Sequence, residues 1–488
     1  MKTRIFTILA ILAIGLAGFT QPAQAQAYTT SFTTSITYTN VGTADTTTLQ
    51  ILFFALPTTT TPITITQPNL AVGASASVYI GSVTQVTAGF KGSAIMQADQ
   101  QLLATLVQVP GGSVVKVRPM SNGFAGGAAQ SLIATVLKNT FGSNTVFSVQ
   151  NVDSETNNIN IKFYNTSATL VYETPAPIVV ESGASTYWDT GATGDPLGTA
   201  FNGSAVVTAT RVGGGDGAIV SSAMELDITL RGAKAFEGVA QGATDFFMPS
   251  ALCKFNSSGF IQDTAYAVQN TSLTASTNVT VTYSDNNSSN TYVVAKPIGP
   301  GSKASFVACD AGMPANFIGS AVVHSDATPV IAVGKAVNGG LSTAFVGAAA
   351  GSGTAKVALP YVRWTSTANY NTGNWQRSFI AIQNIGTSAI TGNITVQYLD
   401  CHGAVVGTPH TITPPAGGLL VGKKVNSNAG NAGIAELNLC DGGPNYGAGA
   451  MVLGPAGSQL AVIVRVQTMD TTYNVSVGED YNGFNMTP

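Results

Sequence analysis

Cysteines and histidines are the residues of this chain best suited to reactive or metal-binding chemistry. The chain has four cysteines and three histidines, and Cys401 is followed directly by His402, with His410 further along. A thiol beside two imidazoles suits a zinc site or a thiol nucleophile. The first half of the chain has no counterpart of these histidines. Since an exported protein is expected to oxidise Cys401, we expect no metal centre and no catalytic cysteine here.

The cysteines are instead expected to form disulfides. Four cysteines allow three pairings. Cys309 begins Cys-Asp-Ala-Gly and Cys440 begins Cys-Asp-Gly-Gly, and both precede an aromatic residue that starts a small-residue motif. They therefore hold equivalent places in two successive repeats and should not bond each other. The sequence predicts the disulfides Cys253–Cys309 and Cys401–Cys440.

Aspartates in turns are the candidates for a bound ion. Asp189 and Asp195 lie in glycine-rich turns, and Asp285 lies in a turn of Asn, Asp and Ser. Ca²⁺ prefers several oxygen ligands from one loop, which makes calcium the one cofactor with candidate ligands. Turn-forming aspartates explain the same pattern without a metal, and we otherwise expect no cofactor.

Aromatic residues before the last repeat could stack on a ligand. Trp364, Tyr370 and Trp375 lie in a stretch rich in Asn and Thr. Such rings more commonly pack between domains, which is the use we favour here, and the alternative is stacking on a sugar, which makes a glycan a candidate partner.

Signatures of common enzymes are absent from the sequence. It contains no Gly-x-Ser-x-Gly elbow and no His-Glu-x-x-His pair. The stretch from Gly417 to Lys424 resembles a phosphate loop but lacks the Ser or Thr that must follow the lysine. We expect a protein that is not an enzyme.

The amino terminus has the three parts of a secretory signal peptide. Lys2 and Arg4 precede an apolar run over 5–19, and Ala23-Gln-Ala25 provides a small-residue cleavage site. No later stretch reaches the roughly 18 apolar residues of a membrane-spanning helix. We expect a protein that is secreted, extracellular or at the cell surface, with no transmembrane segment.

Charge is unusually sparse. Only 9% of residues are charged, and the formal net charge is −3. Such a surface does not attract nucleic acid. Hydroxyl and amide groups with little electrostatic repulsion permit self-association or contacts with other surface proteins.

Four repeats account for most of the chain. Each opens with a strand that ends in Asn, at Asn40, Asn151, Asn270 and Asn384. Each later reaches a motif of an aromatic residue and small residues, which begins at Phe90, Phe201, Phe317 or Tyr446. A period of this length indicates one small domain used four times.

Within a repeat, the pattern is that of short strands. In Asn278-Val-Thr-Val-Thr-Tyr283, apolar and polar residues alternate as they do in a half-buried strand. The sequence predicts an all-β fold of four tandem antiparallel β-sandwich, immunoglobulin-like domains in an elongated array after the signal peptide. The expected boundaries are 1–25 for the signal peptide and 26–120, 121–231, 232–340 and 341–488 for the four repeats.

Junctions between repeats carry the motifs Phe124-Ala-Gly126, Phe236-Glu-Gly238 and Phe345-Val-Gly347, each followed by an extra apolar strand. We expect neighbouring domains to dock through these segments. No such strand precedes the first repeat, whose sheet edge is then either unpaired or simply a trimmed cap.

The succession of Gln-Asn, Val-Thr-Val-Thr-Tyr-Ser-Asp, Pro-Gly-Ser and Gly-Ser-Ala-Val-Val resembles tandem β-sandwich repeat proteins secreted to the bacterial cell surface. The resemblance implies a surface location and structural or adhesive roles. We expect a secreted structural protein, a subunit of a layer, sheath or filament. The alternative is an adhesin or an array of carbohydrate-binding modules.

Overall fold

The computed structural model describes residues 31–56, 61–111, 117–227, 232–257, 260–338, 341–365, 374–437, 439–440, 445–446, 448–470 and 475–486. The expected signal peptide and Tyr370 lie outside these residues. Within them the protein is all-β, and its helical elements are three short 3-10 turns, η1 (Ile80–Ser82), η2 (Ala308–Ala311) and η3 (Ala429–Ala432). None of these turns is long or apolar enough to cross a membrane.

In the described residues, antiparallel strands form eight sheets of three to six strands, two for each sequence repeat, and one further two-stranded sheet near the end of the fourth repeat. The strands of the first two repeats are β1 (Phe32–Asn40), β2 (Leu49–Ala55), β3 (Ile63–Thr66), β4 (Ser75–Tyr79), β5 (Gly92–Ala98), β6 (Leu102–Pro110), β7 (Met120–Asn122), β8 (Gln130–Lys138), β9 (Ser143–Asn151), β10 (Asn157–Asn165), β11 (Leu170–Glu173), β12 (Ile178–Val180), β13 (Ser185–Asp189), β14 (Phe201–Arg211), β15 (Ile219–Asp227) and β16 (Ala233–Glu237).

The third and fourth repeats follow the same order. Their strands are β17 (Asp245–Cys253), β18 (Phe255–Ser257), β19 (Phe260–Asn270), β20 (Thr277–Asp285), β21 (Thr291–Ile298), β22 (Lys303–Val307), β23 (Phe317–Ser325), β24 (Val330–Asn338), β25 (Leu341–Val346), β26 (Ala348–Ala349), β27 (Lys356–Leu359), β28 (Trp364–Thr365), β29 (Asn374–Asn384), β30 (Ile394–Leu399), β31 (Val405–Ile412), β32 (Lys424–Asn428), β33 (Glu436–Leu437), β34 (Leu439–Cys440), β35 (Asn445–Tyr446), β36 (Gly449–Leu453), β37 (Leu460–Asp470), β38 (Val475–Asn482) and β39 (Phe484–Asn485).

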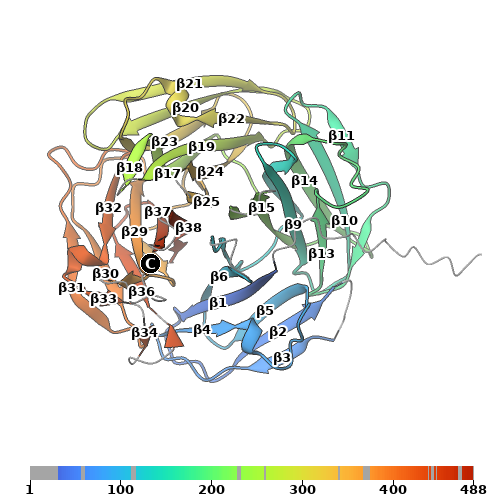
Figure 1. The fold of residues 1–488 in the computed structure, drawn as a ribbon, viewed down its shortest axis with the longest axis horizontal. Helices are drawn as coiled ribbons and strands as arrows, with labels where there is room; N and C mark the ends of the chain where they lie inside the picture. The colour runs from blue at the N-terminus through green and yellow to red at the C-terminus, as the bar shows by residue number, and fades with distance from the viewer. Residues whose placement is uncertain are drawn as a thin grey trace, which may run out of the picture.

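Each repeat contributes one axial and one peripheral sheet. The axial sheets contain the strands that end in the repeated Asn and lie nearer the centre of Figure 1, whereas the peripheral sheets lie outside them. The axial sheets are β4-β1-β6-β7, β13-β9-β15-β16, β18-β19-β24-β25 with β22, and β33-β28-β29-β37-β38 with β32; the peripheral sheets are β3-β2-β5, β11-β10-β14-β8 with β12, β21-β20-β23-β17-β26 and β31-β30-β36-β27-β39.

The alternation expected for 278–283 is confirmed in β20. Val279, Val281 and Tyr283 are fully buried in the core between the two sheets of the third repeat, whereas Thr280 and Thr282 are half-buried. Apolar burial on one face of each sheet is therefore what joins the two sheets of a repeat.

The repeated Asn is a structural residue. Asn151 is buried, and its side-chain Nδ2 donates to the carbonyl oxygens of Glu155 (2.7 Å) and Val180 (2.9 Å). Its side-chain oxygen accepts from the backbone N–H of Asp153. Asn40, Asn270 and Asn384 make the same set of bonds. The Asn thus satisfies loop carbonyls that burial would otherwise leave without partners.

The glycine of the aromatic motif is required by close packing. A Cβ on Gly203 would lie 2.1 Å from the Tyr164 carbonyl oxygen and 2.5 Å from the Phe201 ring. Gly92 and Gly319 are as crowded, by the neighbouring strand and by Phe90 and Phe317. The aromatic ring folds over the glycine, which explains why the two recur together.

The four repeats close into a ring (Figure 1). The first and last repeats meet directly, since the Ser75 amide donates to the Cys401 carbonyl oxygen (2.9 Å) and Arg118 pairs with Glu479 (2.7 Å). The predicted elongated array is therefore wrong. Each interface between neighbours turns the chain in the same sense, and after four repeats the turns bring the last repeat against the first.

The last strands of the four axial sheets contact one another in a closed circle. β7 contacts β16, β16 contacts β25, β25 contacts β38, and β38 contacts β7. Asn482 exchanges two hydrogen bonds with the Val346 backbone, and its carbonyl oxygen accepts from the Asn122 side chain (2.7 Å). The backbone N–H of Asn122 donates to the Glu237 carboxylate.

This circle changes two expectations about the junctions. Strand register shows that Ser121-Asn122-Gly123 holds the position in the first repeat that the Phe236 and Phe345 motifs hold in the second and third. The motif at Phe124 does not hold that position. In addition, β16 and β25 pair with the preceding axial sheets although they follow the expected boundaries at 231 and 340. Sheet pairing thus extends the second and third repeats to Glu237 and Val346.

The extra junction strands join the peripheral sheets. β8, β17 and β27 pair with β14, β23 and β36 respectively. In the first repeat, β5 is the strand equivalent to β14, β23 and β36. It pairs with β2 and with no second strand among the described residues. β5 also contains no buried residue, whereas β14 and β23 are mostly buried. Among the described residues, the first repeat therefore has a sheet edge that no strand covers, and the neighbouring element it touches is β13 of the second repeat.

Candidate functional site

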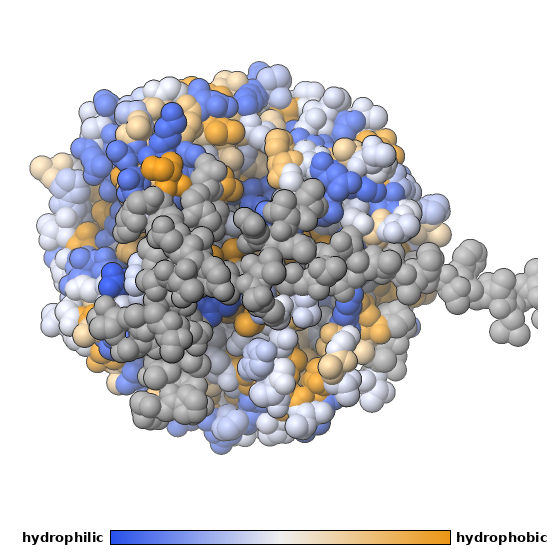
Figure 2. Space-filling model, in the orientation of Figure 1, coloured by the Kyte–Doolittle hydropathy of each residue, from blue (hydrophilic) through white to orange (hydrophobic). Residues whose placement is uncertain are grey.

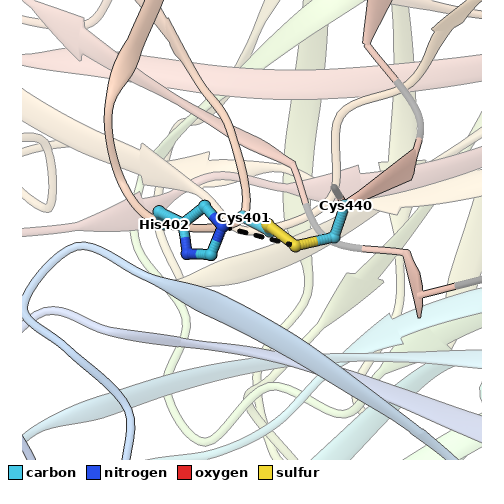
Figure 3. A group of neighbouring side chains, drawn as sticks. All are labelled: Cys401, His402 and Cys440. Atoms are coloured by element: carbon cyan, nitrogen blue, oxygen red, sulfur yellow. Dashed lines mark hydrogen bonds between the residues drawn. A yellow bond between two sulfur atoms is a disulfide. The ribbon is translucent and has the colours of Figure 1, made fainter. Parts of the chain in front are cut away.

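The structure forms the two disulfides expected from the sequence, Cys253–Cys309 and Cys401–Cys440. Figure 3 shows His402 beside the second of them, with its Nε2 atom 4.0 Å from Cys440 Sγ. These three residues are close enough together to hold a metal ion. Because thiolates are the ligands and nucleophiles of such sites, the disulfide state leaves Cys401 without either chemistry.

His410 is used elsewhere. Its Nδ1 atom lies 2.8 Å from the Ser427 hydroxyl, which also contacts the Tyr398 hydroxyl. Burial lowers the pKa of His410. The structure therefore does not bring His410 into the group of His402 and Cys401.

The three aspartates considered for calcium are not gathered together. Asp195 pairs with Lys138 (2.9 Å) and accepts from the Trp188 indole (3.0 Å). Asp189 accepts from the Gly191 amide, and Asp285 accepts from the Asn287 amide in a tight turn. Within the part of the chain that the structure describes, none of them belongs to a group of three or more close metal ligands.

Trp364 and Trp375 are neighbours in space. The Arg377 guanidinium lies 5.0 Å from the Trp364 ring centre and 4.7 Å from the Trp375 ring centre, and both rings are half-buried. One cation therefore bridges two of the three aromatic residues singled out in the sequence.

Interfaces between consecutive repeats share one hydrogen-bond arrangement, which we call the Gln–Ser clamp. At the second-to-third interface, the Gln269 amide donates to the Ala205 and Gly301 carbonyl oxygens (both 3.3 Å), and the Ser204 hydroxyl donates to Gly301 (2.6 Å). Gln150 with Ser93 and Gln383 with Ser320 form the clamps of the first-to-second and third-to-fourth interfaces. The repeated Gln and Ser thus orient each repeat on the next.

A buried charge cluster lies at the second-to-third interface. Glu225 of the second repeat accepts from Lys335 (2.5 Å) of the third, and Lys234 lies 3.5 Å away. The Thr135 hydroxyl donates to Glu225 (3.0 Å) and accepts from Lys335 (3.0 Å) and Lys303 (2.9 Å). One carboxylate is therefore shared among three lysines.

Burial and charge act oppositely on this cluster. Burial alone would raise the pKa of Glu225, but the ammonium groups of Lys335 and Lys234 outweigh it and lower that pKa to about 2. Burial, followed by repulsion from Lys335, lowers the pKa of Lys303 to about 7. Glu225 is thus a firmly ionised group on which the lysines depend.

Sequence reasoning missed this cluster, although one signal for it exists. In each of the third and fourth repeats, a lysine lies two residues after the glycine whose carbonyl oxygen accepts the clamp bonds. These pairs are Gly301 with Lys303 and Gly422 with Lys424. A lysine repeated at the start of a strand whose neighbours are buried points to an interface.

Comparisons with known proteins provide little. No family model and no curated protein matches the chain. A solved structure titled "Crystal Structure of Thermotoga maritima 1070" shares 18% identity over 22% of this chain and 95% of its own, with a TM-score of 0.19. A similarity at that level carries no argument about the fold or function of this protein.

Proposed function

We propose that this protein is a secreted structural subunit of the cell surface, built from four immunoglobulin-like sandwiches in a ring, that associates with copies of itself. The observation that carries this proposal is the open edge of β5. A free edge offers backbone donors and acceptors to a strand from another molecule. In the other three repeats the equivalent edge is covered by β8, β17 or β27.

The rest of the surface supports the same role. Charged residues are scarce, and Figure 2 shows hydrophobic and hydrophilic residues interspersed over the face in view. Secretion is supported by the leader-like sequence of residues 1–25 and by the two disulfides, which form and persist in oxidising compartments.

A charge on the open edge tests the proposal. Ile95 lies on β5 but outside the core cluster that its neighbours Ala94 and Met96 join. Ile95→Lys should keep the fold and reduce assembly, because an edge lysine opposes strand pairing. Negative-stain imaging and light scattering of the secreted protein would measure the change.

The matched control is Val293→Lys. Val293 is 56% exposed and lies on β21, an edge strand of another peripheral sheet. We expect the wild-type protein and Val293→Lys to form large particles and Ile95→Lys to remain monomeric. A wild-type protein that stays monomeric at high concentration would contradict the proposal.

Glycan binding by an adhesin is the second candidate function. The observation in its favour is that Trp364 and Trp375 lie together around Arg377 with their rings partly exposed. Trp375→Ala should then reduce retention on immobilised glycans and leave particle formation unchanged. Equal retention by the variant and the wild-type protein would remove this candidate.

A further inference from the structure

The second-to-third and third-to-fourth interfaces are built on the same strand positions. The Thr145 hydroxyl accepts from the backbone N–H of Leu137, and the Thr264 hydroxyl accepts from that of Leu252. Because these two bonds are equivalent, they align the positions of the second repeat with those of the third. In that register Lys424 corresponds to Lys303, Arg465 to Lys335 and Ser250 to Thr135. The cationic half of the charge cluster is therefore present at both interfaces.

The carboxylate of the cluster is present at one interface only. Glu225 pairs with Thr145 across the sheet, and the residue paired with Thr264 is Ala336. Lys234 is likewise replaced by Thr343, whose buried hydroxyl has no hydrogen-bond partner in the described part of the chain. The third-to-fourth interface thus has the cations of the cluster but no carboxylate at the position of Glu225.

A cavity of about 220 Å³ lies at this interface. Lys424 and Arg465 are its charged lining residues, and both are more than nine-tenths buried. Arg465 already forms a two-fold ion pair with Asp480 (2.9 and 2.7 Å). The Lys424 ammonium makes no hydrogen bond to any described residue, so one positive charge in the cavity is uncompensated.

A second buried donor faces the same cavity. Gln262 is 1% exposed, and its Nε2 atom has no hydrogen-bond partner among the residues that the structure describes. Buried donors of this kind are costly unless a partner is supplied. Further lining comes from Phe255, Phe379 and Ile463, which give the cavity an apolar wall, while the exposed Asn426 lies at its rim.

We propose that this cavity binds a small monocarboxylate, whose carboxylate takes the place that Glu225 fills at the neighbouring interface and whose apolar part lies against Phe255 and Phe379. One uncompensated ammonium matches one negative charge. The Gln262 amide and the Ser250 hydroxyl offer further hydrogen bonds, and the apolar wall favours an organic acid over an inorganic anion.

Binding should depend on pH. Burial, and then repulsion from Arg465, lower the pKa of Lys424 to about 7. The charged groups packed around Lys424 are Arg465 and, behind it, Asp480. A carboxylate therefore binds best below this pKa, where Lys424 is charged, and loses its partner as the pH rises.

Calorimetric titration of the full-length protein with butyrate tests the proposal, and butyramide serves as the uncharged ligand of the same shape. At pH 6.5 we expect butyrate to bind with a Kd on the order of 1 mM, as befits so small a ligand, and butyramide not to bind. At pH 9.5 butyrate binding should weaken by at least about tenfold.

Three variants locate the site. Lys424→Met should abolish binding, and Ala336→Glu should do the same because it supplies the missing carboxylate from the chain itself. Lys303→Met alters the neighbouring interface and should leave binding unchanged. No butyrate binding by the wild-type protein, equal binding of butyramide, or unchanged binding in Lys424→Met would overturn the proposal. Circular dichroism would establish that each variant is folded.

Discussion

The interfaces between consecutive repeats and the interface that closes the ring are built in different ways. Consecutive repeats use the Gln–Ser clamp three times. At the closing interface Thr39 stands where the clamp has Gln, and Gly449 stands where it has Ser. Contact there relies on the Arg118–Glu479 pair and on Asn122 with Asn482.

This difference shows which contacts a repeat sequence can encode. The clamp Gln recurs in the second, third and fourth repeats, each of which follows another repeat, and the clamp Ser recurs in the first, second and third, each of which precedes one. The closing contacts of Arg118 and Asn122 occur once, with residues more than 350 positions away. Incomplete packing does not distinguish the two kinds of interface, since the closing interface contains a cavity of about 130 Å³ lined by Thr39 and Gly449 among others, and the third-to-fourth interface contains the one of about 220 Å³.

The largest effect is expected from breaking the closing ion pair. Glu479 is 1% exposed, and Arg118→Met removes the cation that pairs with its carboxylate, which leaves the more distant attraction of Arg363. We expect a loss of about 3–5 kcal/mol in the free energy of unfolding, measured by urea denaturation. Small-angle scattering should also show a larger radius if the ring opens.

Arg211→Met is the control for this prediction. Its pair with Asp153 lies within the second repeat, and the Arg211 side chain is 44% exposed. The Asp153 side chain is 4% exposed, but water at the exposed Arg211 side chain screens the pair, so we expect a smaller loss, of about 1 kcal/mol. Equal losses in the two variants would contradict the special role of the closing pair.

A smaller effect is expected from removing a clamp. Gln269→Leu leaves the Ala205 and Gly301 carbonyl oxygens with fewer partners, which should cost about 1–3 kcal/mol. Thr39→Val at the closing interface removes a single bond to the Ser75 hydroxyl and should cost less. Thermal unfolding of both variants measures the comparison; a greater loss in Thr39→Val would reverse it.

The smallest effect concerns pH. Lys303 and Lys424 have a pKa of about 7 in the folded protein and the ordinary higher value when unfolded. Above pH 7 the unfolded chain therefore binds more protons, and stability rises with pH. Each lysine should add about 1 kcal/mol between pH 7 and 8.

Lys424→Met separates the two contributions, since it should raise stability at pH 7 and reduce the slope of stability against pH. Urea denaturation at a series of pH values would measure it. A slope unchanged by Lys424→Met would show that Lys424 keeps its proton when folded.

The sequence predicted those features that recur along the chain. Alternating Val and Thr in 278–283 predicted a half-buried strand, and the equivalent places of Cys309 and Cys440 predicted both disulfides. The repeated Asn marked the strand end at which it satisfies loop carbonyls. Each of these depends on contacts within one repeat, which local pattern reveals.

Features that depend on distant partners could not be predicted. Nothing near Arg118 in the sequence indicates Glu479, and without that pair the array was expected to be straight. Glu225 and Ala336 also look unremarkable in sequence, because their importance comes from lysines of the next repeat. The Lys424 cavity is visible only when the two interfaces are superimposed by strand register.

Circular closure also bears on how the chain reaches its folded state. Arg118 and Asn122 obtain their partners from β38, which follows them in the chain by 361 and 360 residues respectively. Contacts so distant in sequence form late and slowly. A nascent polypeptide released before β38 would therefore leave the last contacts of its first repeat unmade, and quality-control proteases could distinguish it from the finished molecule.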